Sequence, residues 1–186
     1  MHERRYNQAI ERLRDPQRVE RLEVARVVGI ALEGLNNAKT VLDIGTGSGL
    51  FAEQFAAKGL RVTGLDANPE MLPAAREFVP TGTFQEGVAE KLPFTDGTFD
   101  LIFMGLVLHE TDNVLAALRE ANRVAIKRLA VLEWPYEEGT FGPPLEHRVS
   151  PDRITSLAQQ TGFEVTQILR LESLVLYLFD KVAKPT

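Results

Sequence analysis

The chain contains no cysteine. Disulfide bonds, thiolate metal sites and cysteine nucleophiles are therefore excluded. Long apolar runs are lacking too, because the run at 174–179 is far too short to cross a bilayer. The charged residues at 1–5 are not followed by the apolar core of a signal peptide. We therefore expect no membrane span and a cytoplasmic location.

Positive charge and histidine are scarce as well. The 21 Lys and Arg residues are outnumbered by 26 Asp and Glu, and the net charge of −5 argues against nonspecific binding of nucleic acid. The histidines, His2, His109 and His147, lack the spacing of metal ligands, so no metal site is expected. A length of 186 residues suits a single domain, 1–186, with one core.

The apolar residues predict alternating strands and helices. Strands are expected at 41–44, 61–65, 83–86, 99–105, 128–133, 163–171 and 174–181. Helices are expected between most of them and in two segments before the first strand: one through Tyr6, Ile10 and Leu13, and one from Asp15 to near Gly34. This order predicts an α/β, Rossmann-like fold, a mainly parallel seven-stranded sheet with helices on both faces and an antiparallel closing strand.

Three glycines separated by single residues follow the first predicted strand, in the run VLDIGTGSG at 41–49. Glycine lets the backbone approach a ligand where a Cβ atom would collide, and the start of the next helix offers unpaired N–H groups. In the dinucleotide fingerprint G-x-G-x-x-G the third glycine would stand where this chain has Leu50. The spacing therefore favours a nucleotide other than NAD, and a turn that only needs positive φ is the alternative.

Ligands of open α/β sheets bind outside the carboxyl ends of the strands. This rule selects the segments that follow the predicted strands: 45–49, Asp66, 88–90, 105–109 and the residues from Trp134 onward. The carboxylate of Asp66 could accept hydrogen bonds from the two hydroxyls of a ribose. The alternative for Asp66 is that it caps the next helix.

Two further runs, GVAEKLPF at 87–94 and DGTFDLI at 96–102, join 41–49 and 62–66 in a wider pattern. Together these runs resemble the small-molecule branch of the class I S-adenosylmethionine-dependent methyltransferases, which includes the ubiquinone and menaquinone biosynthesis methyltransferases. The resemblance covers most of 40–133. It implies S-adenosylmethionine as the cofactor, S-adenosylhomocysteine as its product, and a small-molecule substrate rather than nucleic acid.

The resemblance also implies which residues bind each part of the cofactor. The methionine part would lie against the end of the first strand and the glycine loop: Asp43, Gly45, Thr46, Gly47 and Gly49. The ribose hydroxyls would be bound by Asp66. The adenine would lie against residues that follow the second and third strands: Ala67, Met71, Ala89 and Glu90. The sulfonium would be flanked by Gly105 and Leu106.

The sequence departs from the family's pattern at two places. Val88 stands where many relatives carry an aspartate that receives the adenine amino group, so this contact would come from the backbone or from Glu90, or be missing. Relatives usually continue the helix that ends near Val124 with a proline-glycine-glycine turn, but this chain has AIKR at 125–128. We expect a changed loop there, with Lys127 and Arg128 close to a helix C-terminus.

One histidine is the candidate catalytic residue. His109 follows the fourth predicted strand, and imidazole titrates near neutral pH, so His109 could act as a general base on a protonated acceptor. The alternative is that it orients the next helix. Glu110 is expected to be solvated or to cap that helix, whereas Glu133, at the end of the fifth strand, could face the site.

The segment at 134–150 has neither helical nor alternating periodicity, and we predict that it is a substrate lid. Its histidine, arginine and aromatic residues could enclose a planar or anionic acceptor: Trp134, Tyr136, Phe141, His147 and Arg148. The alternative is a surface loop whose aromatic rings seal the core. Tyr6 and the opening helix could also close over the cofactor, by analogy with relatives.

These expectations divide the domain into N-terminal helices (1–39), a cofactor-binding core (40–133), the lid (134–150) and a C-terminal helix and strand pair (151–186). The predicted function is methyl transfer from S-adenosylmethionine to an unidentified small molecule. Two alternatives stay open: a catalytically silent cofactor-binding module that serves a protein partner, and a nicotinamide oxidoreductase. The lack of cysteine argues against arsenite methylation, since arsenite methyltransferases hold arsenic through thiols.

Overall fold

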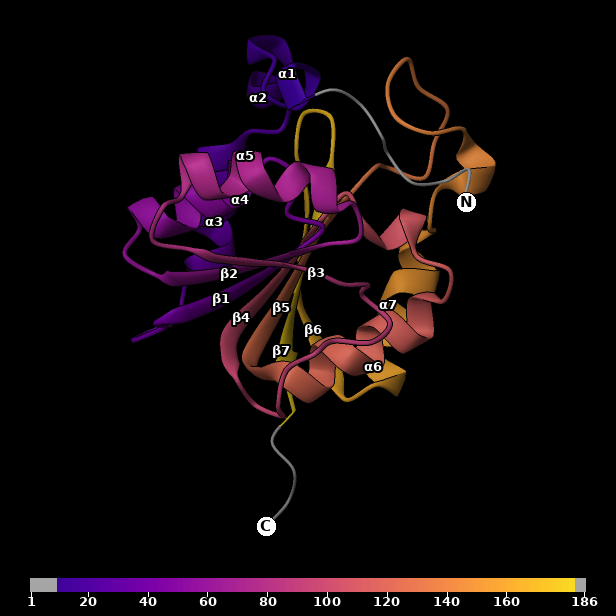
Figure 1. Ribbon diagram of the computed structural model, residues 1–186. Coiled ribbons are helices and arrows are strands. Elements are labelled where there is room, and N and C mark those ends of the chain that lie inside the picture. Colours follow the sequence, from indigo (N-terminus) through magenta and orange to yellow (C-terminus); the bar gives the residue numbers. More distant parts are fainter. Residues whose placement is uncertain (1–9, 183–186) are drawn as a thin grey trace.

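The computed structural model describes residues 10–182, and its centre is one seven-stranded sheet in the order β3-β2-β1-β4-β5-β7-β6 (Figure 1). The strands are β1 (Thr40–Ile44), β2 (Arg61–Asp66), β3 (Thr83–Glu86), β4 (Phe99–Gly105), β5 (Ala125–Glu133), β6 (Phe163–Arg170) and β7 (Val175–Lys181). Neighbouring strands pair in parallel except for β7, which is antiparallel to both β5 and β6. The predicted fold class is confirmed. Tyr6 lies outside the described residues.

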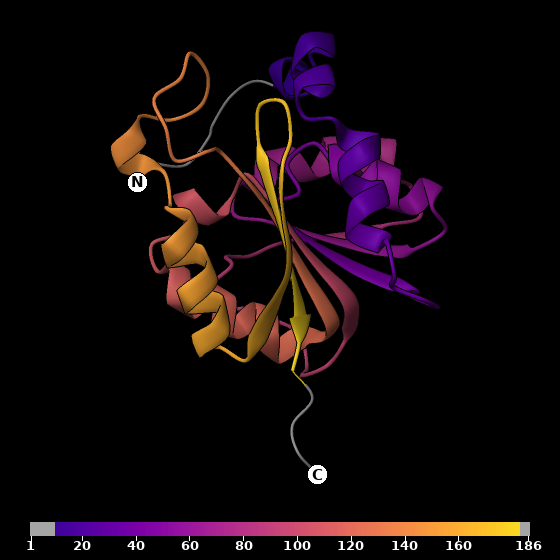
Figure 2. The same ribbon diagram turned by 180° about the vertical axis from the view of Figure 1, so that it is seen from behind.

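Helices cover both faces of this sheet. The α-helices are α1 (Ile10–Leu13), α2 (Pro16–Arg21), α3 (Val24–Leu32), α4 (Leu50–Ala57), α5 (Leu72–Phe78), α6 (Val114–Val124) and α7 (Pro151–Gln160). Three 3-10 turns are η1 (Pro69–Met71), η2 (Leu108–Glu110) and η3 (Leu145–His147). Figures 1 and 2 show α3, α4 and α5 on one face and α6 and α7 on the other. Among residues 10–182, no helix has both the length and the apolar character needed to span a membrane.

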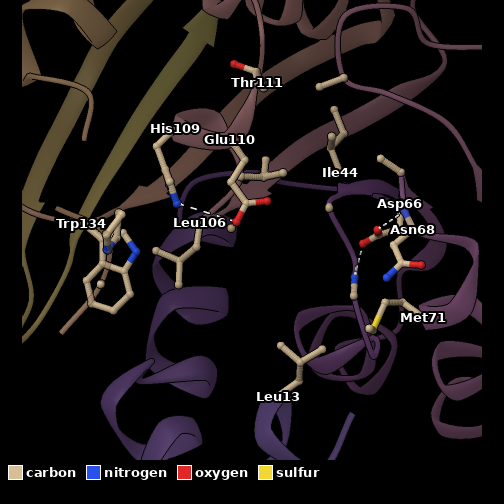
Figure 3. A pocket seen from close by; sticks show the side chains of 18 of the residues that line it. Leu13, Ile44, Asp66, Asn68, Met71, Leu106, His109, Glu110, Thr111 and Trp134 are labelled. Carbon is tan, nitrogen blue, oxygen red and sulfur yellow. Dashed lines mark hydrogen bonds and ion pairs between the residues drawn. The ribbon is translucent and has the colours of Figure 1, made fainter. Parts of the chain in front are cut away.

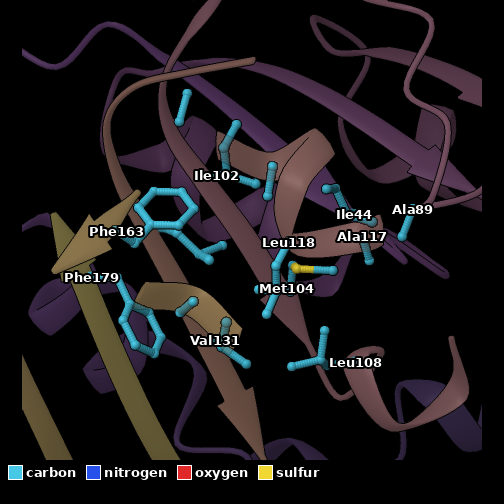
Figure 4. Close-up of a cluster of buried hydrophobic side chains, with 14 of the residues drawn as sticks. Ile44, Ala89, Ile102, Met104, Leu108, Ala117, Leu118, Val131, Phe163 and Phe179 are labelled. Atoms are coloured by element: carbon cyan, nitrogen blue, oxygen red, sulfur yellow. The ribbon is translucent and has the colours of Figure 1, made fainter. Parts of the chain in front are cut away.

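The core has one apolar layer on each face of the sheet, and β4 contributes to both. Ile102 and Met104 point into the layer under α6 and α7, which Figure 4 shows, whereas Leu101 and Phe103 point into the layer under α3, α4 and α5. This alternation follows from the twofold period of a strand. Because β4 is buried on both faces, it holds its carboxyl end firmly at the rim where the site lies.

The prediction of one long helix from Asp15 to near Gly34 is wrong in the middle. The Asp15 side chain caps α2 as expected, but the chain breaks before α3 at Glu23, which has a left-handed φ of 46°. The break rotates the following helix, so that Ala25 and Gly29, expected on the inner face, are exposed. Four other α3 side chains pack inward instead: Val24, Val27, Val28 and Ala31.

The expected loop at 125–128 is also absent, because β5 begins at Ala125, directly after α6 ends at Val124. Arg128 is therefore a buried residue within β5. Its guanidinium donates hydrogen bonds to both carboxylate oxygens of Asp180. Its guanidinium also donates to the carbonyl oxygen of Glu33 at 2.6 Å, at the C-terminus of α3. The predicted match of Arg128 to a helix C-terminus therefore applies to α3 and not to α6.

Candidate functional site

A cavity of about 580 Å³ lies at the carboxyl ends of the strands. Figure 3 shows side chains that converge on it from β1, from the segments after β2 and β4, and from the N-terminal helices. Ten of the thirteen predicted site residues line it: Gly45, Gly47, Asp66, Ala67, Met71, Ala89, Glu90, Gly105, Leu106 and His109. The other three are buried: Asp43 near the end of β1, and Thr46 and Gly49 in the turn that follows it.

The glycine loop is folded back onto the end of β2, since the N–H groups of Gly45 and Thr46 both donate to the carbonyl oxygen of Leu65, at 2.8 and 3.0 Å. Gly45 has a φ of +70°, and a Cβ atom there would lie 2.5 Å from a methyl carbon of Val107. No larger residue fits without moving the segment that follows β4. Gly47, at a φ of +52°, lines the cavity, and a Cβ atom there would lie 3.7 Å from a methyl carbon of Leu13.

Asp66 connects two of the segments that form the rim. Its Oδ2 accepts the N–H of Gly47 at 2.7 Å, and its Oδ1 accepts the N–H of Asn68 at 2.8 Å (Figure 3). A carboxylate has about four acceptor sites, so these two backbone N–H groups alone do not saturate it. The side chain that caps η1 is that of Asn68, which accepts the N–H of Glu70, so the capping alternative for Asp66 does not account for its position.

Asp43 is a buried acid behind the loop. Its side chain is 2% exposed, and its Oδ2 accepts the hydroxyl hydrogen of Thr46 at 2.7 Å. Burial raises the pKa of Asp43 to about 7, and the nearby charge of Asp66 adds to the rise, while the Thr46 hydrogen bond opposes it. A carboxyl that titrates near neutral pH beside a ligand cavity is a common property of functional sites.

On the predicted adenine side, Val88 lines the cavity together with Ala89. The Oε1 atom of Glu90 accepts the N–H groups of Asp112 and Asn113, at 2.7 and 3.3 Å. Glu90 therefore holds the start of α6, which leaves its other oxygen for a ligand.

His109 lies in η2 and is 8% exposed. Its Nδ1 is 2.8 and 3.1 Å from the two carboxylate oxygens of Glu133, and its backbone N–H donates to the same carboxylate at 3.1 Å. Its Nε2 lies 3.8 Å from an oxygen of Glu110 (Figure 3). Burial lowers the pKa of His109, but the charges of Glu133 and Glu110 outweigh it and hold the pKa above the ordinary value.

In the predicted lid at 134–150, the side chain of Arg148 points inward, not towards a ligand. The sequence pattern allows Arg148 to help enclose a planar or anionic acceptor, but Arg148 is buried and its guanidinium donates to carbonyl oxygens within 134–150. The acceptors are the carbonyls of Pro135, Glu137, Phe141 and Pro143, at 2.7 to 2.9 Å. The reason is that irregular backbone leaves carbonyls without strand or helix partners, and a five-donor guanidinium satisfies several at once.

Two arginines that the sequence analysis missed do line the cavity, Arg18 and Arg21 of α2. The Arg21 guanidinium lies over the ring of Phe141 in the lid. The tip of the β6–β7 hairpin lies between α2 and the lid in both views (Figures 1 and 2), and Arg170 near this tip pairs with Glu137 of the lid at 2.6 Å. Only the helical spacing of the two arginines, three residues apart, hinted that they share a face.

Within the described part of the chain, no group of three His, Asp or Glu side chains is placed to hold a metal ion.

Comparison with known proteins gives concordant results. The "Methyltransferase domain" family matches residues 42–128. A demethylmenaquinone methyltransferase of Thermotoga maritima is 30% identical over 176 residues, which covers 76% of each chain. A demethylmenaquinone methyltransferase of Chlorobaculum parvum and a malonyl-[acyl-carrier protein] O-methyltransferase of Erwinia pyrifoliae are 36% and 39% identical over 105 residues. That match covers 56% of this chain and only 43% and 40% of those two relatives.

A solved structure described as a SAM-dependent methyltransferase from Aquifex aeolicus superimposes with a TM-score of 0.80 at 28% identity, over 93% of this chain and 97% of that one. The strand order, the glycine loop and the acid at the end of β2 agree with these similarities. The chain belongs to the class I S-adenosylmethionine-dependent methyltransferase family.

Proposed function

We propose that this protein transfers a methyl group from S-adenosylmethionine to a small-molecule acceptor inside the cavity. The observation that carries the proposal is the position of Asp66, held by Gly47 and Asn68 at the rim of a cavity that His109 also lines. A volume of about 580 Å³ falls in the range of roughly 300–1,000 Å³ that is common for ligand sites. No observation favours the alternative, a catalytically silent module that binds the cofactor and serves a protein partner.

The residues present fit the cofactor. The carboxylate of Asp66 would accept the two ribose hydroxyls, and the apolar side chains of Met71, Val88 and Ala89 would contact adenine. Gly47 lines the cavity without a side chain of its own, so the methionine part would lie against the loop backbone there. When bound, S-adenosylmethionine supplies an electrophilic methyl group on a sulfonium. The chain then contributes orientation and the exclusion of water.

The far end of the cavity is proposed as the acceptor chamber. Trp134 and Phe141 form aromatic walls there, and Arg21 lies on Phe141. The names of the relatives cover acceptors as different as demethylmenaquinone and a malonyl-acyl-carrier protein. We therefore infer the acceptor from the walls, which suit a small planar molecule whose reacting atom approaches His109.

The proposal is tested by calorimetric titration of the protein with S-adenosylmethionine, S-adenosylhomocysteine and NADH. Both sulfur nucleotides are expected to bind, and NADH is not. Methyl transfer is then followed with cofactor labelled in the methyl group and a panel of phenols, amines and carboxylates. Binding of NADH without either sulfur nucleotide would contradict the nucleotide assignment. Tight cofactor binding without transfer to any panel member would favour the silent module.

A further inference from the structure

The buried carboxylate of Glu133 is bonded almost entirely to one catalytic candidate. Glu133 ends β5 and is 1% exposed. Its Oε1 accepts the backbone N–H of His109 and its Oε2 accepts the backbone N–H of Trp134, at 3.1 and 3.2 Å. Both oxygens also lie within hydrogen-bond distance of the Nδ1 of His109. Two backbone donors thus fix the carboxylate, and the carboxylate fixes the imidazole ring.

This arrangement decides which ring nitrogen carries the proton. An ionised carboxylate has no hydrogen to donate, so the contact of 2.8 Å requires Nδ1 of His109 to be the donor. In a neutral imidazole the other nitrogen, Nε2, then carries a free lone pair. His109 and Glu110 line the cavity, whereas Glu133 does not, so the lone pair is on the side of the ring away from Glu133 and towards Glu110.

We propose that Glu133 is a positioning residue that holds His109 as the Nδ1–H tautomer, so that Nε2 accepts a proton from the methyl acceptor. This inference rests on the proposed function. It assigns the acceptor to molecules that carry a hydrogen on the atom to be methylated, such as a phenol or an acidic carbon. That X–H bond breaks, its electron pair stays on X as the nucleophile, and the proton passes to Nε2.

The charges around His109 suit this proton transfer. Glu133 and Glu110 stabilise the imidazolium that forms, and Arg148 opposes them more weakly. On β7, burial and then the charge of Glu133 raise the pKa of Tyr177 to about 12, so Tyr177 stays neutral and does not compete for the proton. Arg170 acts in the opposite direction on Tyr177. The pair of carboxylates makes His109 a stronger base than a solvent-exposed histidine.

The test is nitrogen-15 NMR of the ligand-free full chain, which reads both the tautomer and the pKa of each histidine. A His109→Gln spectrum identifies the signals of His109 among the three histidines. Wild-type His109 is expected to be the Nδ1–H tautomer with a pKa above the ordinary value of about 6.5. In Glu133→Gln the pKa is expected to fall to the ordinary value or below it, since burial is then opposed by Glu110 alone.

Glu133→Asp keeps the charge and is expected to retain part of the rise, and Glu110→Gln is the matched control, with a smaller fall and an unchanged tautomer. The Nε2–H tautomer in the wild-type protein would overturn the proposal, and this result does not depend on whether a Glu133 variant folds. An unchanged pKa in a folded Glu133→Gln variant would overturn it too. Because no cofactor is added, these results are independent of whether S-adenosylmethionine binds.

Discussion

The guanidinium of Arg21 lies 3.7 Å from the centre of the Phe141 ring, a contact between helix α2 and the predicted lid at 134–150. Both residues line that cavity, and Phe141 is otherwise 51% exposed. The contact connects two segments that are more than a hundred residues apart in the sequence. The cavity is therefore lined by the N-terminal helices as well as by the segment at 134–150.

Replacing this arginine is expected to loosen the lid. A cation–π contact at an exposed site contributes about 0.5–1 kcal/mol, so Arg21→Ala should speed hydrogen exchange at residues 140–142 by roughly 2- to 5-fold. Arg153→Ala, which removes an exposed arginine of α7, is the matched control and should leave exchange in the lid unchanged. Equal exchange rates at 140–142 in both variants would show that the contact does not hold the lid.

Arg148 is predicted to determine whether the lid folds. Its guanidinium is buried and satisfies four backbone carbonyls, and a hydrogen bond to a charged group contributes about 1.5–3 kcal/mol. Arg148→Ala should lower the free energy of unfolding by about 3 kcal/mol or more, measured in urea. Arg148→Lys should rescue little, because an ammonium cannot reproduce the planar fork. A loss below about 1 kcal/mol in Arg148→Ala would contradict the proposed anchoring.

Two glycines give opposite predictions for the same substitution. Gly45→Ala places a Cβ atom 2.5 Å from a carbon of Val107 at a φ of +70°, so it should cost about 1–3 kcal/mol and impair binding of S-adenosylhomocysteine. Gly29→Ala has no atom within 4 Å and lies in α3, so it should stabilise the protein by about 0.5–1 kcal/mol. Thermal unfolding measures both. Equal changes in stability at the two positions would mean that the positive φ of Gly45 is not required for the stability of the glycine loop.

Asp43 predicts how stability changes with pH. Its pKa is about 7 in the folded chain, against an ordinary value of 3.8 for an aspartate, so the folded state binds more protons between these two pH values. Stability is therefore lost as the pH rises from about 4 to about 7, and the loss is complete above that. Asp43→Asn should remove the loss, with a gain of about 2–4 kcal/mol at pH 8 and little gain at pH 4. A gain that is the same at both pH values would contradict the raised pKa.

Local patterns in the sequence predicted the parts of the fold that depend on local interactions. The period of apolar residues placed β4 at 99–105, which is confirmed with those bounds, and predicted a helix that ends near Val124, where α6 ends. The three glycines predicted the loop after β1, because positive φ is a property of the backbone at each glycine. Most of the predicted site residues line one cavity because the carboxyl ends of parallel strands share one edge of the sheet.

What the sequence could not predict depends on contacts between distant segments. The break at Glu23 is stabilised by the N–H of Glu172, which donates to the Glu23 carboxylate from the β6–β7 hairpin. The direction of Arg148 depends on carbonyls of the folded lid. The pairing of His109 with Glu133 requires that β4 and β5 lie side by side with their ends in register. Each of these contacts is set by tertiary structure, on which local periodicity carries no information.

The central claim is that Asp66 binds the ribose of a sulfur nucleoside, and its most direct test is the affinity for S-adenosylhomocysteine in Asp66→Ala. The exposed acid Asp152 of α7 provides the control, Asp152→Ala. Loss of hydrogen bonds to a charged group should raise the Kd of Asp66→Ala by about 10-fold or more, while the control keeps the wild-type Kd. Circular dichroism should show both variants folded. A folded Asp66→Ala variant with wild-type affinity would contradict the account.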